Sequence, residues 1–387
     1  MRRIVIVGST GSIGTQALDV VERGELDVVG LAAARSWRPL IEQAERHGVR
    51  RIALADEGAA ARAAEVWTDG EVLAGAEGLV QLITESESDM VLNALVGSAG
   101  LGPTVAALGE GIDLALANKE SLVIGGELVM ALAEATGTTI IPVDSEHSAL
   151  YQLVGAERPG HVDRLVLTAS GGPFRGRTAA ELAGVTREQA LAHPTWDMGG
   201  RITVDCATLM NKGFEVIEAH HLFGVPLERI DVLVHPQSLI HAMVHLNDGA
   251  TLAHLGNPDM RVPISYALNH PERPDVPVQT LDLADAGELT FERPDIDTFP
   301  CLRLAREAVA AGGTAPCVLN AADEVAVQAF LDEQLPFTGI AEVVARALDA
   351  LEPTPVGHFS DLYRADARAR EVATELVAST AAAVERA

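Results

Sequence analysis

The chain has 387 residues, a length at which a single hydrophobic core usually gives way to two or three domains. Its formal net charge of −27 argues against nucleic-acid binding, because a phosphate backbone demands a cationic surface. We therefore expect no nucleic-acid partner. No uninterrupted apolar run approaches the roughly 18 residues that a membrane span needs, so we expect no membrane partner either. The three cysteines form no CxxC pair, which is typical of the reducing cytoplasm.

Lysine is rare in this sequence. Only Lys119 and Lys212 are lysines among the 28 basic residues, and each directly follows an asparagine. A compact, flexible ammonium group can make contacts that a planar guanidinium cannot. We therefore interpret both lysines as site candidates, with chance retention at the surface as the alternative.

Residues 1–141 alternate apolar runs with helix-length segments. The runs lie at residues 4–7, 28–33, 52–55, 90–95 and 114–117. This alternation predicts an α/β fold with a Rossmann-like, doubly wound parallel sheet. The first run leads into the motif GSTGSIG at residues 8–14 and then into an amphipathic segment. This order predicts that the pyrophosphate of a dinucleotide binds at the N-terminus of a helix. A tight strand-to-helix turn without a ligand is the alternative.

The second predicted strand ends at Ala34, Arg35 and Ser36. Enzymes that select NAD usually place Asp or Glu at this point, and a carboxylate would repel the 2′-phosphate of NADP. Arg35 and Ser36 would instead bind that phosphate, so the sequence favours NADPH. A solvated surface arginine is the alternative.

The run at residues 114–117 is followed by Asn118, Lys119 and Glu120. Ligands of open parallel sheets bind beyond the carboxyl ends of the strands, so we expect this tip at the nicotinamide end of the cofactor. A plain turn with Ser121 as a helix cap is the alternative.

Residues 142–270 mix strands, helices and glycine-rich loops, and they hold ten of the twelve histidines. Asp144 and Glu146 follow an apolar run, and in an extended backbone they would project to the same side. Two such carboxylates repel each other unless a cation or a proton lies between them. A helix N-terminus capped by Asp144 or Ser145 is an equally good interpretation.

A single helix is predicted over residues 204–218, with Thr208, Asn211, Lys212 and Glu215 on one polar face. Glu215 would complete a set of three oxygen ligands with Asp144 and Glu146. Without cysteine or clustered histidine ligands, a hard ion such as Mg²⁺ or Mn²⁺ is favoured over Zn²⁺.

Two loops, a proline-rich segment and the C-terminal part carry further predictions. The motif SGGPFR at residues 170–175 could offer a hydroxyl and backbone N–H groups to a phosphate. Residues 193–201 join a tryptophan and a methionine to a glycine pair, as a closing lid would, although an ordinary loop around a buried Trp is the alternative. A proline-rich linker is expected at residues 271–300, and helical spacing beyond residue 301 predicts a small helical bundle.

Six motifs in this order resemble those of the 1-deoxy-D-xylulose 5-phosphate reductoisomerases. They are GSTGSIG (8–14), ANKES (117–121), PVDSEH (142–147), SGGPFR (170–175), NKG followed by Glu215 (211–215), and VHPQS (234–238). The resemblance covers the full length. It implies conversion of 1-deoxy-D-xylulose 5-phosphate to 2-C-methyl-D-erythritol 4-phosphate in the non-mevalonate isoprenoid (MEP) pathway, with NADPH and Mg²⁺, Mn²⁺ or Co²⁺, by a cytoplasmic homodimer.

The resemblance also implies a domain plan. Residues 1–141 would bind NADPH, residues 142–270 would carry the catalytic and metal-binding groups and the dimer interface, residues 271–300 would be a linker, and residues 301–387 would form the helical domain.

Individual roles follow from the same resemblance. The implied metal ligands are Asp144, Glu146 and Glu215, and Lys119 and His193 join them in catalysis. The implied NADPH contacts are Gly8, Thr10, Gly11, Ser12, Ile13, Ala34, Arg35, Ser36, Asn118, Glu120 and Gly199. The implied substrate contacts are Lys119, Ser145, Glu146, Ser170, His193, Trp196, Met198, Cys206, Asn211, Lys212 and Glu215.

Cys206 departs from the family pattern, which usually has serine there. Because a thiol is a weak hydrogen-bond donor, phosphate affinity would be altered. Two other functions stay open. One is an NADP-dependent sugar-phosphate or semialdehyde reductase without isomerisation, which would have no use for three metal carboxylates. The other is a non-enzymatic NADP-sensing regulator.

Overall fold

The computed structural model describes residues 1–196 and 198–384, which divide into two compact units. Unit 1 comprises Met1–Ser121, Val129–Tyr151 and Asp259–Gln279. Unit 2 comprises Leu122–Leu128, Gln152–Pro258 and the chain from Thr280 onward. Each unit therefore contains segments that are far apart in the sequence.

Unit 1 is built on a seven-stranded sheet in which every neighbouring pair runs parallel. The strand order is β4-β3-β2-β1-β5-β6-β7, so β1 is central and the order reverses between β1 and β5. The strands are β1 (Arg2–Val7), β2 (Leu26–Ala33), β3 (Arg51–Leu54), β4 (Glu71–Ala74), β5 (Met90–Asn93), β6 (Asp113–Leu116) and β7 (Ile140–Pro142). A ligand-binding crevice is expected at such a reversal.

This sheet confirms the predicted doubly wound arrangement. Strand β4 was not among the predicted strands, because only Leu73 of its four residues is buried and the run is too polar to stand out. Its neighbour β3 is fully apolar after Arg51 and was predicted.

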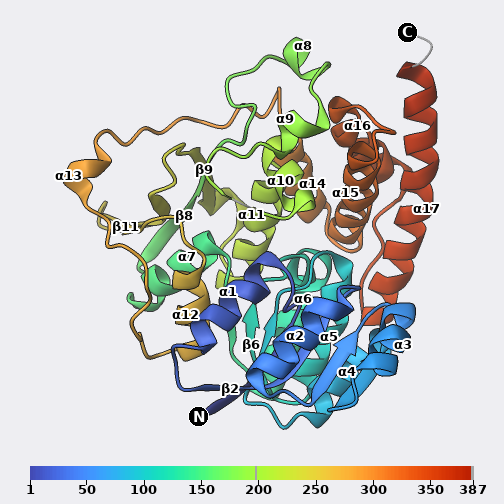
Figure 1. Ribbon diagram of the computed structural model, residues 1–387. Helices are drawn as coiled ribbons and strands as arrows, with labels where there is room; N and C mark the ends of the chain where they lie inside the picture. Colours follow the sequence, from blue (N-terminus) through green and yellow to red (C-terminus); the bar gives the residue numbers. More distant parts are fainter. Residues whose placement is uncertain (197, 385–387) are drawn as a thin grey trace. The chain divides into compact units, whose positions relative to one another are not determined.

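Helices cover both faces of the sheet (Figure 1). On one face, a continuous apolar core forms from strand residues such as Ile4 and Leu31 and from four helices: α1 (Ser12–Val21), α2 (Trp37–His47), α3 (Glu57–Val66) and α12 (Arg261–Asn269). Val5 projects to the opposite face and meets Leu82 of α4 (Gly75–Glu85) beside Gly30. The short η1 (Ser98–Gly100) and α5 (Leu101–Gly109) follow on that side, and α6 (Glu120–Thr136) bends at Gly125.

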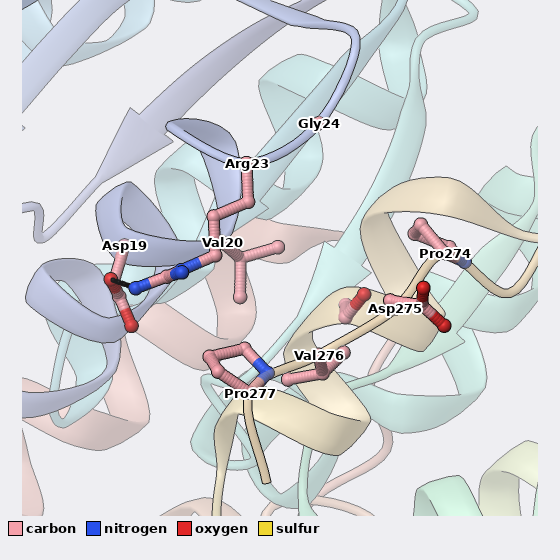
Figure 2. Close-up of a pocket in the computed structure, with 9 residues that line it drawn as sticks. Asp19, Val20, Arg23, Gly24, Pro274, Asp275, Val276 and Pro277 are labelled. Carbon is pink, nitrogen blue, oxygen red and sulfur yellow. Dashed lines mark hydrogen bonds and ion pairs between the residues drawn. The ribbon is translucent and has the colours of Figure 1, made fainter.

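The chain re-enters unit 1 through α12 and residues 270–279. Residues 274–277 pass the C-terminal end of α1 and line a small surface pocket with Asp19, Val20 and Arg23 (Figure 2). Arg23 donates a hydrogen bond of 3.2 Å to Asp19 at this point. The first part of the predicted proline-rich linker is thus an ordered segment packed against unit 1.

Unit 2 contains a four-stranded sheet of order β11-β10-β8-β9. Strands β8 (Val162–Ala169) and β9 (Ile230–Val234) are parallel, whereas β10 (Ile240–Leu246) runs antiparallel to β8 and to β11 (Thr251–Leu255). Helix α11 (Met210–Phe223) packs against β8 and β9. The remaining elements of this region are α7 (Ser145–Gly155), which begins in unit 1, α8 (Ala179–Leu182), α9 (Arg187–Leu191), α10 (Gly200–Thr208) and η2 (Leu227–Arg229).

The C-terminal helices of unit 2 lie together at the brown and red end of the chain (Figure 1). They are α14 (Cys301–Ala311), α15 (Ala315–Leu331), α16 (Phe337–Ala350) and α17 (Phe359–Val384), and a short α13 (Leu283–Ala286) precedes them. Helix α15 is central because it packs against α14, α16 and α17, which confirms the predicted helical bundle. Among the described helices, none combines the length and hydropathy that crossing a bilayer would require.

Candidate functional site

The glycine-rich loop joins β1 to α1 in unit 1. Gly8 has a φ of +92°, and a Cβ atom there would lie 2.5 Å from the carbonyl oxygen of Ala94. A Cβ atom on Gly14 would lie 2.3 Å from the carbonyl oxygen of Gly8. Side chains are therefore excluded, which lets the backbone approach a ligand closely. Gly11 is the N-cap of α1 and has no side chain to occupy the first-turn N–H groups, as a pyrophosphate site requires.

The predicted 2′-phosphate contacts lie just beyond β2. Ala34, Arg35 and Ser36 are all exposed, and the Arg35 side chain is 83% exposed. Its Nε lies 3.4 Å from Oδ2 of Asp56, whose other oxygen accepts a hydrogen bond of 2.7 Å from the N–H of Ala59 and so caps α3. The guanidinium is thus held near the end of β2 by one exposed ion pair, which costs little to exchange for a phosphate.

Asn118 and Glu120 form a buried network at the ends of β5 and β6. The Asn118 amide donates to the carbonyl oxygens of Leu95 and Gly97, both at 2.9 Å, and its Oδ1 accepts from Ser121. Oε1 of Glu120 accepts a 2.8 Å hydrogen bond from the N–H of Gly97. Because the hydrogen-bonding capacity of the Asn118 side chain is used within the protein, a cofactor contact there would use its main chain.

Lys119 and Asp144 form a buried ion pair in unit 1. The Lys119 Nζ lies 2.5 Å from Oδ2 of Asp144, and the lysine is 5% exposed. Burial alone would raise the pKa of Asp144, but the Lys119 ammonium and the nearby His147 ring outweigh burial and hold that pKa below its ordinary value. The carboxylate is therefore ionised. Sequence reasoning missed His147, whose Nδ1 lies 3.7 Å from the same oxygen; its i,i+3 spacing from Asp144 was the available signal.

The backbone after Asp144 is helical. Helix α7 begins at Ser145, so the extended interpretation of residues 144–146 is wrong and the helical alternative is right. The reason is local: the Asp144 carboxylate accepts from the N–H of Ser145 at 3.1 Å, and the N–H of Ser148 donates to the carbonyl oxygen of Asp144. The Ser145 hydroxyl donates to the Glu146 carboxylate in the first turn.

The single helix predicted over residues 204–218 is wrong. Leu209 adopts a left-handed conformation, with φ 63° and ψ 12°, which ends α10 at Thr208 and starts α11 at Met210. The Thr208 hydroxyl accepts a 3.2 Å hydrogen bond from the N–H of Met210, and burial of the Leu209 side chain compensates for the unusual backbone. Thr208 therefore does not share a helix with Asn211, Lys212 and Glu215.

Lys212 and Glu215 form a second buried pair, in unit 2. Lys212 is 3% exposed and Glu215 is 1% exposed, and the ammonium group hydrogen-bonds to the carboxylate. Nδ2 of Asn211 donates to Oε1 of Glu215 at 2.6 Å. Gly213 lets α11 approach α14 closely, because a Cβ there would lie 2.6 Å from the Cβ of Ala305.

Ser170 and His193 contact each other in unit 2. The Ser170 Oγ lies 2.9 Å from Nε2 of His193, and Nδ1 of His193 accepts from the N–H groups of Thr195 and Trp196. Because Nδ1 is an acceptor, the proton of the neutral ring is on Nε2 and is donated to Ser170. Burial lowers the pKa of His193, which keeps the ring neutral. The serine oxygen also accepts from the N–H of Gly172 at 3.2 Å, so its own O–H is left to donate to a ligand.

The loop after β8 lies against α10. Gly171 and Gly172 have φ values of +84° and +69°, and a Cβ on Gly172 would lie 2.7 Å from the carbonyl oxygen of Cys206. Ser170 and Cys206 are thus on neighbouring segments. In the predicted lid, Trp196 and Met198 are half-buried and Gly199 is the exposed N-cap of α10, whereas residue 197 lies outside the described residues.

Each unit by itself brings several predicted groups together. Unit 1 joins Lys119 with Asp144, and unit 2 joins Lys212, Asn211 and Glu215 as well as Ser170 and His193. Asp144 and Glu146 belong to unit 1 and Glu215 to unit 2, so the meeting of the three predicted metal ligands at one ion stays a prediction.

Models of one protein family match most of the chain. The model described as 1-deoxy-D-xylulose 5-phosphate reductoisomerase matches residues 4–126. The C-terminal domain of the same family matches residues 140–223, and the model described as the DXP reductoisomerase C-terminal domain matches residues 255–372.

Similar proteins carry the same family name. A 1-deoxy-D-xylulose 5-phosphate reductoisomerase from Symbiobacterium thermophilum is 53% identical over 96% of this chain and 98% of its own length. One from Anaeromyxobacter sp. (strain K) is 52% identical over 98% of both chains. The solved structure of the Zymomonas mobilis enzyme in complex with NADPH is 42% identical, with a TM-score of 0.89, and covers 97% of this chain and 99% of that one. A DOX-P reductoisomerase solved with NADPH, fosmidomycin and magnesium is 36% identical, with a TM-score of 0.91, over 97% and 98%.

Proposed function

This chain belongs to the 1-deoxy-D-xylulose 5-phosphate reductoisomerase family, and from that premise we propose how its residues carry out the reaction. The reaction is the NADPH- and divalent-metal-dependent isomerisation and reduction of 1-deoxy-D-xylulose 5-phosphate to 2-C-methyl-D-erythritol 4-phosphate. Family membership confirms the NADP-dependent oxidoreductase predicted from the sequence. It does not favour the reductase without isomerisation or the non-enzymatic regulator.

One observation carries the assignment of the site. The only two lysines of the chain, Lys119 and Lys212, are both buried, and each contacts one of the carboxylates predicted to hold the metal. A buried ammonium beside an ionised carboxylate is expensive unless function requires it, because both groups lose hydration. The same arrangement occurs independently in unit 1 and in unit 2.

The glycine-rich loop supports an NADPH site in unit 1. The positions closed to a Cβ atom at Gly8 and Gly14, and the uncapped start of α1, fit a pyrophosphate. We propose that backbone atoms of Thr10, Gly11, Ser12 and Ile13 bind this group and that Arg35 and Ser36 bind the 2′-phosphate. Asn118, Glu120 and Gly199 would complete the contacts.

The predicted metal ligands are all carboxylates, the donor set that a hard divalent ion prefers. We propose that Asp144, Glu146 and Glu215 hold the ion. A bound divalent ion would polarise the substrate carbonyl and stabilise negative charge on its oxygens. The chain's own contribution is to keep these carboxylates ionised, as the Lys119 ammonium does for Asp144.

The phosphate end of the substrate would bind in unit 2. Ser170 has an O–H available for donation because His193 and Gly172 both donate to its oxygen. Asn211 and Lys212 at the start of α11 would add an amide and an ammonium, and Cys206 of α10 a weak thiol donor. We propose that Trp196 and Met198 close over the substrate and exclude water.

We also propose a domain plan, an oligomeric state and a cellular location. The three-domain plan, with boundaries at residues 141, 270 and 300, is supported at its first boundary by separate family matches to residues 4–126 and 140–223. A homodimer follows from the family resemblance, and light scattering on the purified protein would measure it. The cytoplasm is proposed because the cysteines of the described residues form no disulfide bond, as is usual in a reducing compartment.

The proposed reaction is tested by following NADPH absorbance after adding 1-deoxy-D-xylulose 5-phosphate, with Mn²⁺ and with a chelator. We expect rapid oxidation only with metal, and Glu215→Gln should lower kcat by at least about 100-fold because one ligand charge is lost. Glu307→Gln, at an exposed ion pair on α14, is the matched control and should behave as wild type. Oxidation that persists in the chelator would instead indicate the metal-free reductase.

A further inference from the structure

A glutamine of α2 holds the glycine-rich loop of unit 1 by two hydrogen bonds. Nε2 of Gln43 donates to the carbonyl oxygen of Ser9 at 3.0 Å, and the Ser9 hydroxyl donates to Oε1 of Gln43 at 2.8 Å. Two hydrogen bonds to one residue fix its orientation as well as its position, because each bond is directional. Neither residue is among the proposed cofactor, metal or substrate contacts.

Gln43 occupies a position on α2 that would otherwise suit an apolar side chain. It is half-buried and shares a helix face with Leu40, which is fully buried in the apolar core of the unit. An amide in such a place loses hydration, so its burial is unfavourable unless its oxygen and its nitrogen both find partners. Ser9 supplies both partners, and the pairing therefore accounts for an amide at this position.

Ser9 itself faces the interior of the protein. It is fully buried, and its N–H donates to the carbonyl oxygen of Ala32 in β2 at 2.9 Å. A Cβ atom on Gly14 of α1 would lie 2.4 Å from the Cα of Ser9. Because β2, α1 and α2 all contact this residue, its side chain is closed to a ligand. Ser9 can still affect a ligand through Thr10, the next residue, which is half-buried.

The Ser9 carbonyl is the group through which Gln43 reaches the proposed pyrophosphate site. The peptide bond between Ser9 and Thr10 is trans and planar, so this carbonyl and the N–H of Thr10 point in opposite directions. A hydrogen bond from Gln43 that fixes the carbonyl therefore also fixes the direction of the Thr10 N–H. Backbone N–H groups bind a pyrophosphate well only when they point at it, because misaligned hydrogen bonds weaken steeply.

We propose that Gln43 is a positioning residue for NADPH, which orients the peptide between Ser9 and Thr10 so that the Thr10 N–H faces the pyrophosphate. This role rests on the proposed NADPH site. Arg35 and Ser36 are assigned to the 2′-phosphate, which NADPH has and NADH lacks, whereas the pyrophosphate is common to both cofactors. Loss of the Gln43 amide should therefore weaken both cofactors alike.

Titration of the purified full-length protein with NADPH and with NADH tests this role. Gln43→Met keeps a side chain of similar length and removes both hydrogen bonds, so Kd should rise about tenfold or more for each cofactor. Ser9→Ala removes only the bond to Oε1 and keeps the bond to the carbonyl, so Kd should rise about threefold. Glu42→Met, at an exposed position on the same helix, is the matched control and should bind as wild type.

The double variant separates the pairing from two unrelated effects. With Gln43→Met in place the Ser9 hydroxyl has already lost its partner, so adding Ser9→Ala should not raise Kd further. Additive losses from the two substitutions would show that the residues act independently, which would overturn the positioning role.

Kinetics shows whether the effect is confined to the cofactor. With Mn²⁺ and 1-deoxy-D-xylulose 5-phosphate, Gln43→Met should raise KM for NADPH and leave KM for the substrate within about twofold of wild type. Thermal unfolding checks that the variant is folded, and if it is not, the titration of Ser9→Ala decides. Wild-type affinity for NADPH in the deciding variant, or a loss of NADPH binding without a loss of NADH binding, would overturn the positioning role. If wild type binds NADPH but does not turn over the substrate, the proposed reaction fails while the titrations still report on Gln43.

Discussion

Both lysine–carboxylate pairs place an ammonium group beside a carboxylate with little exposure to water, but different structural features bring each pair together. Lys119 and Asp144 follow two different elements, β6 and β7, and meet because parallel strands end at the same edge of the sheet. Lys212 and Glu215 are three residues apart on α11, and the register of that helix alone brings them together. The first pair therefore depends on the fold of unit 1, and the second on where α11 begins.

Replacing each lysine is expected to have the largest effect on kinetics and stability, and it tests whether the two pairs have different roles. Lys119→Met should lower kcat by about 100-fold, because Lys119 is proposed to act at the reacting end, whereas Lys212→Met should mainly raise KM for the substrate by a similar factor. Each variant also leaves a buried carboxylate without its partner, which costs about 3–5 kcal/mol of stability. Steady-state kinetics and thermal unfolding measure both. Equal effects on kcat and KM from the two variants would contradict the division of roles.

A backbone change in unit 1 should have the next largest effect. Gly8→Ala places a Cβ 2.5 Å from the carbonyl oxygen of Ala94 at a φ that favours glycine, so we expect KM for NADPH to rise at least about tenfold. Gly109→Ala is the matched control, because a Cβ there has no neighbour within 4 Å. Steady-state kinetics with varied NADPH measures KM, and isothermal titration measures the affinity for NADPH directly. Unaltered NADPH affinity in Gly8→Ala would place the pyrophosphate elsewhere.

Arg35, just after β2, is proposed to bind the 2′-phosphate of NADPH, so replacing it tests that single contact. Arg35→Ala should weaken NADPH binding by about 1.5–3 kcal/mol, the contribution of a charged hydrogen bond, and leave NADH binding unchanged. Arg38→Ala removes a neighbouring arginine that lies over the ring of Trp37 and serves as the control. The ratio of kcat/KM for the two cofactors is the measurement. A ratio unaffected by Arg35→Ala would exclude the proposed 2′-phosphate contact.

The smallest effect is expected at Cys206 in unit 2. Cys206→Ser replaces a weak thiol donor with a hydroxyl on the half-buried side chain of α10, so KM for the substrate should fall about threefold or more. Ala207→Ser is an unsuitable comparison because Ala207 is fully buried, so Cys206→Ala serves as the control and should leave KM unchanged or raise it slightly. A rise in KM with serine would show that the thiol does not face the phosphate.

Errors in the sequence analysis concentrate where side chains compete with the backbone. Asp144 accepts a hydrogen bond from the N–H of the next residue at the start of a helix, which decides between the extended and helical interpretations that the sequence had left equal. Thr208 bonds to Met210 and, with Leu209 left-handed, divides a pattern that read as one helix. In both cases the structure corrects the local backbone geometry, and the roles of the candidate residues stay predictions.

The sequence by itself determined the elements whose signals are local. Glycine spacing and apolar runs located the glycine-rich loop, the parallel sheet and the helical C-terminal part, and the scarcity of lysine marked Lys119 and Lys212 as site candidates. Only the tertiary structure decided which buried charges meet. His147 beside Asp144 and Arg201 beside Asp323 are such cases. The physical reason is that burial and electrostatic pairing depend on distances between elements, and a linear pattern records spacing along the chain but not through space.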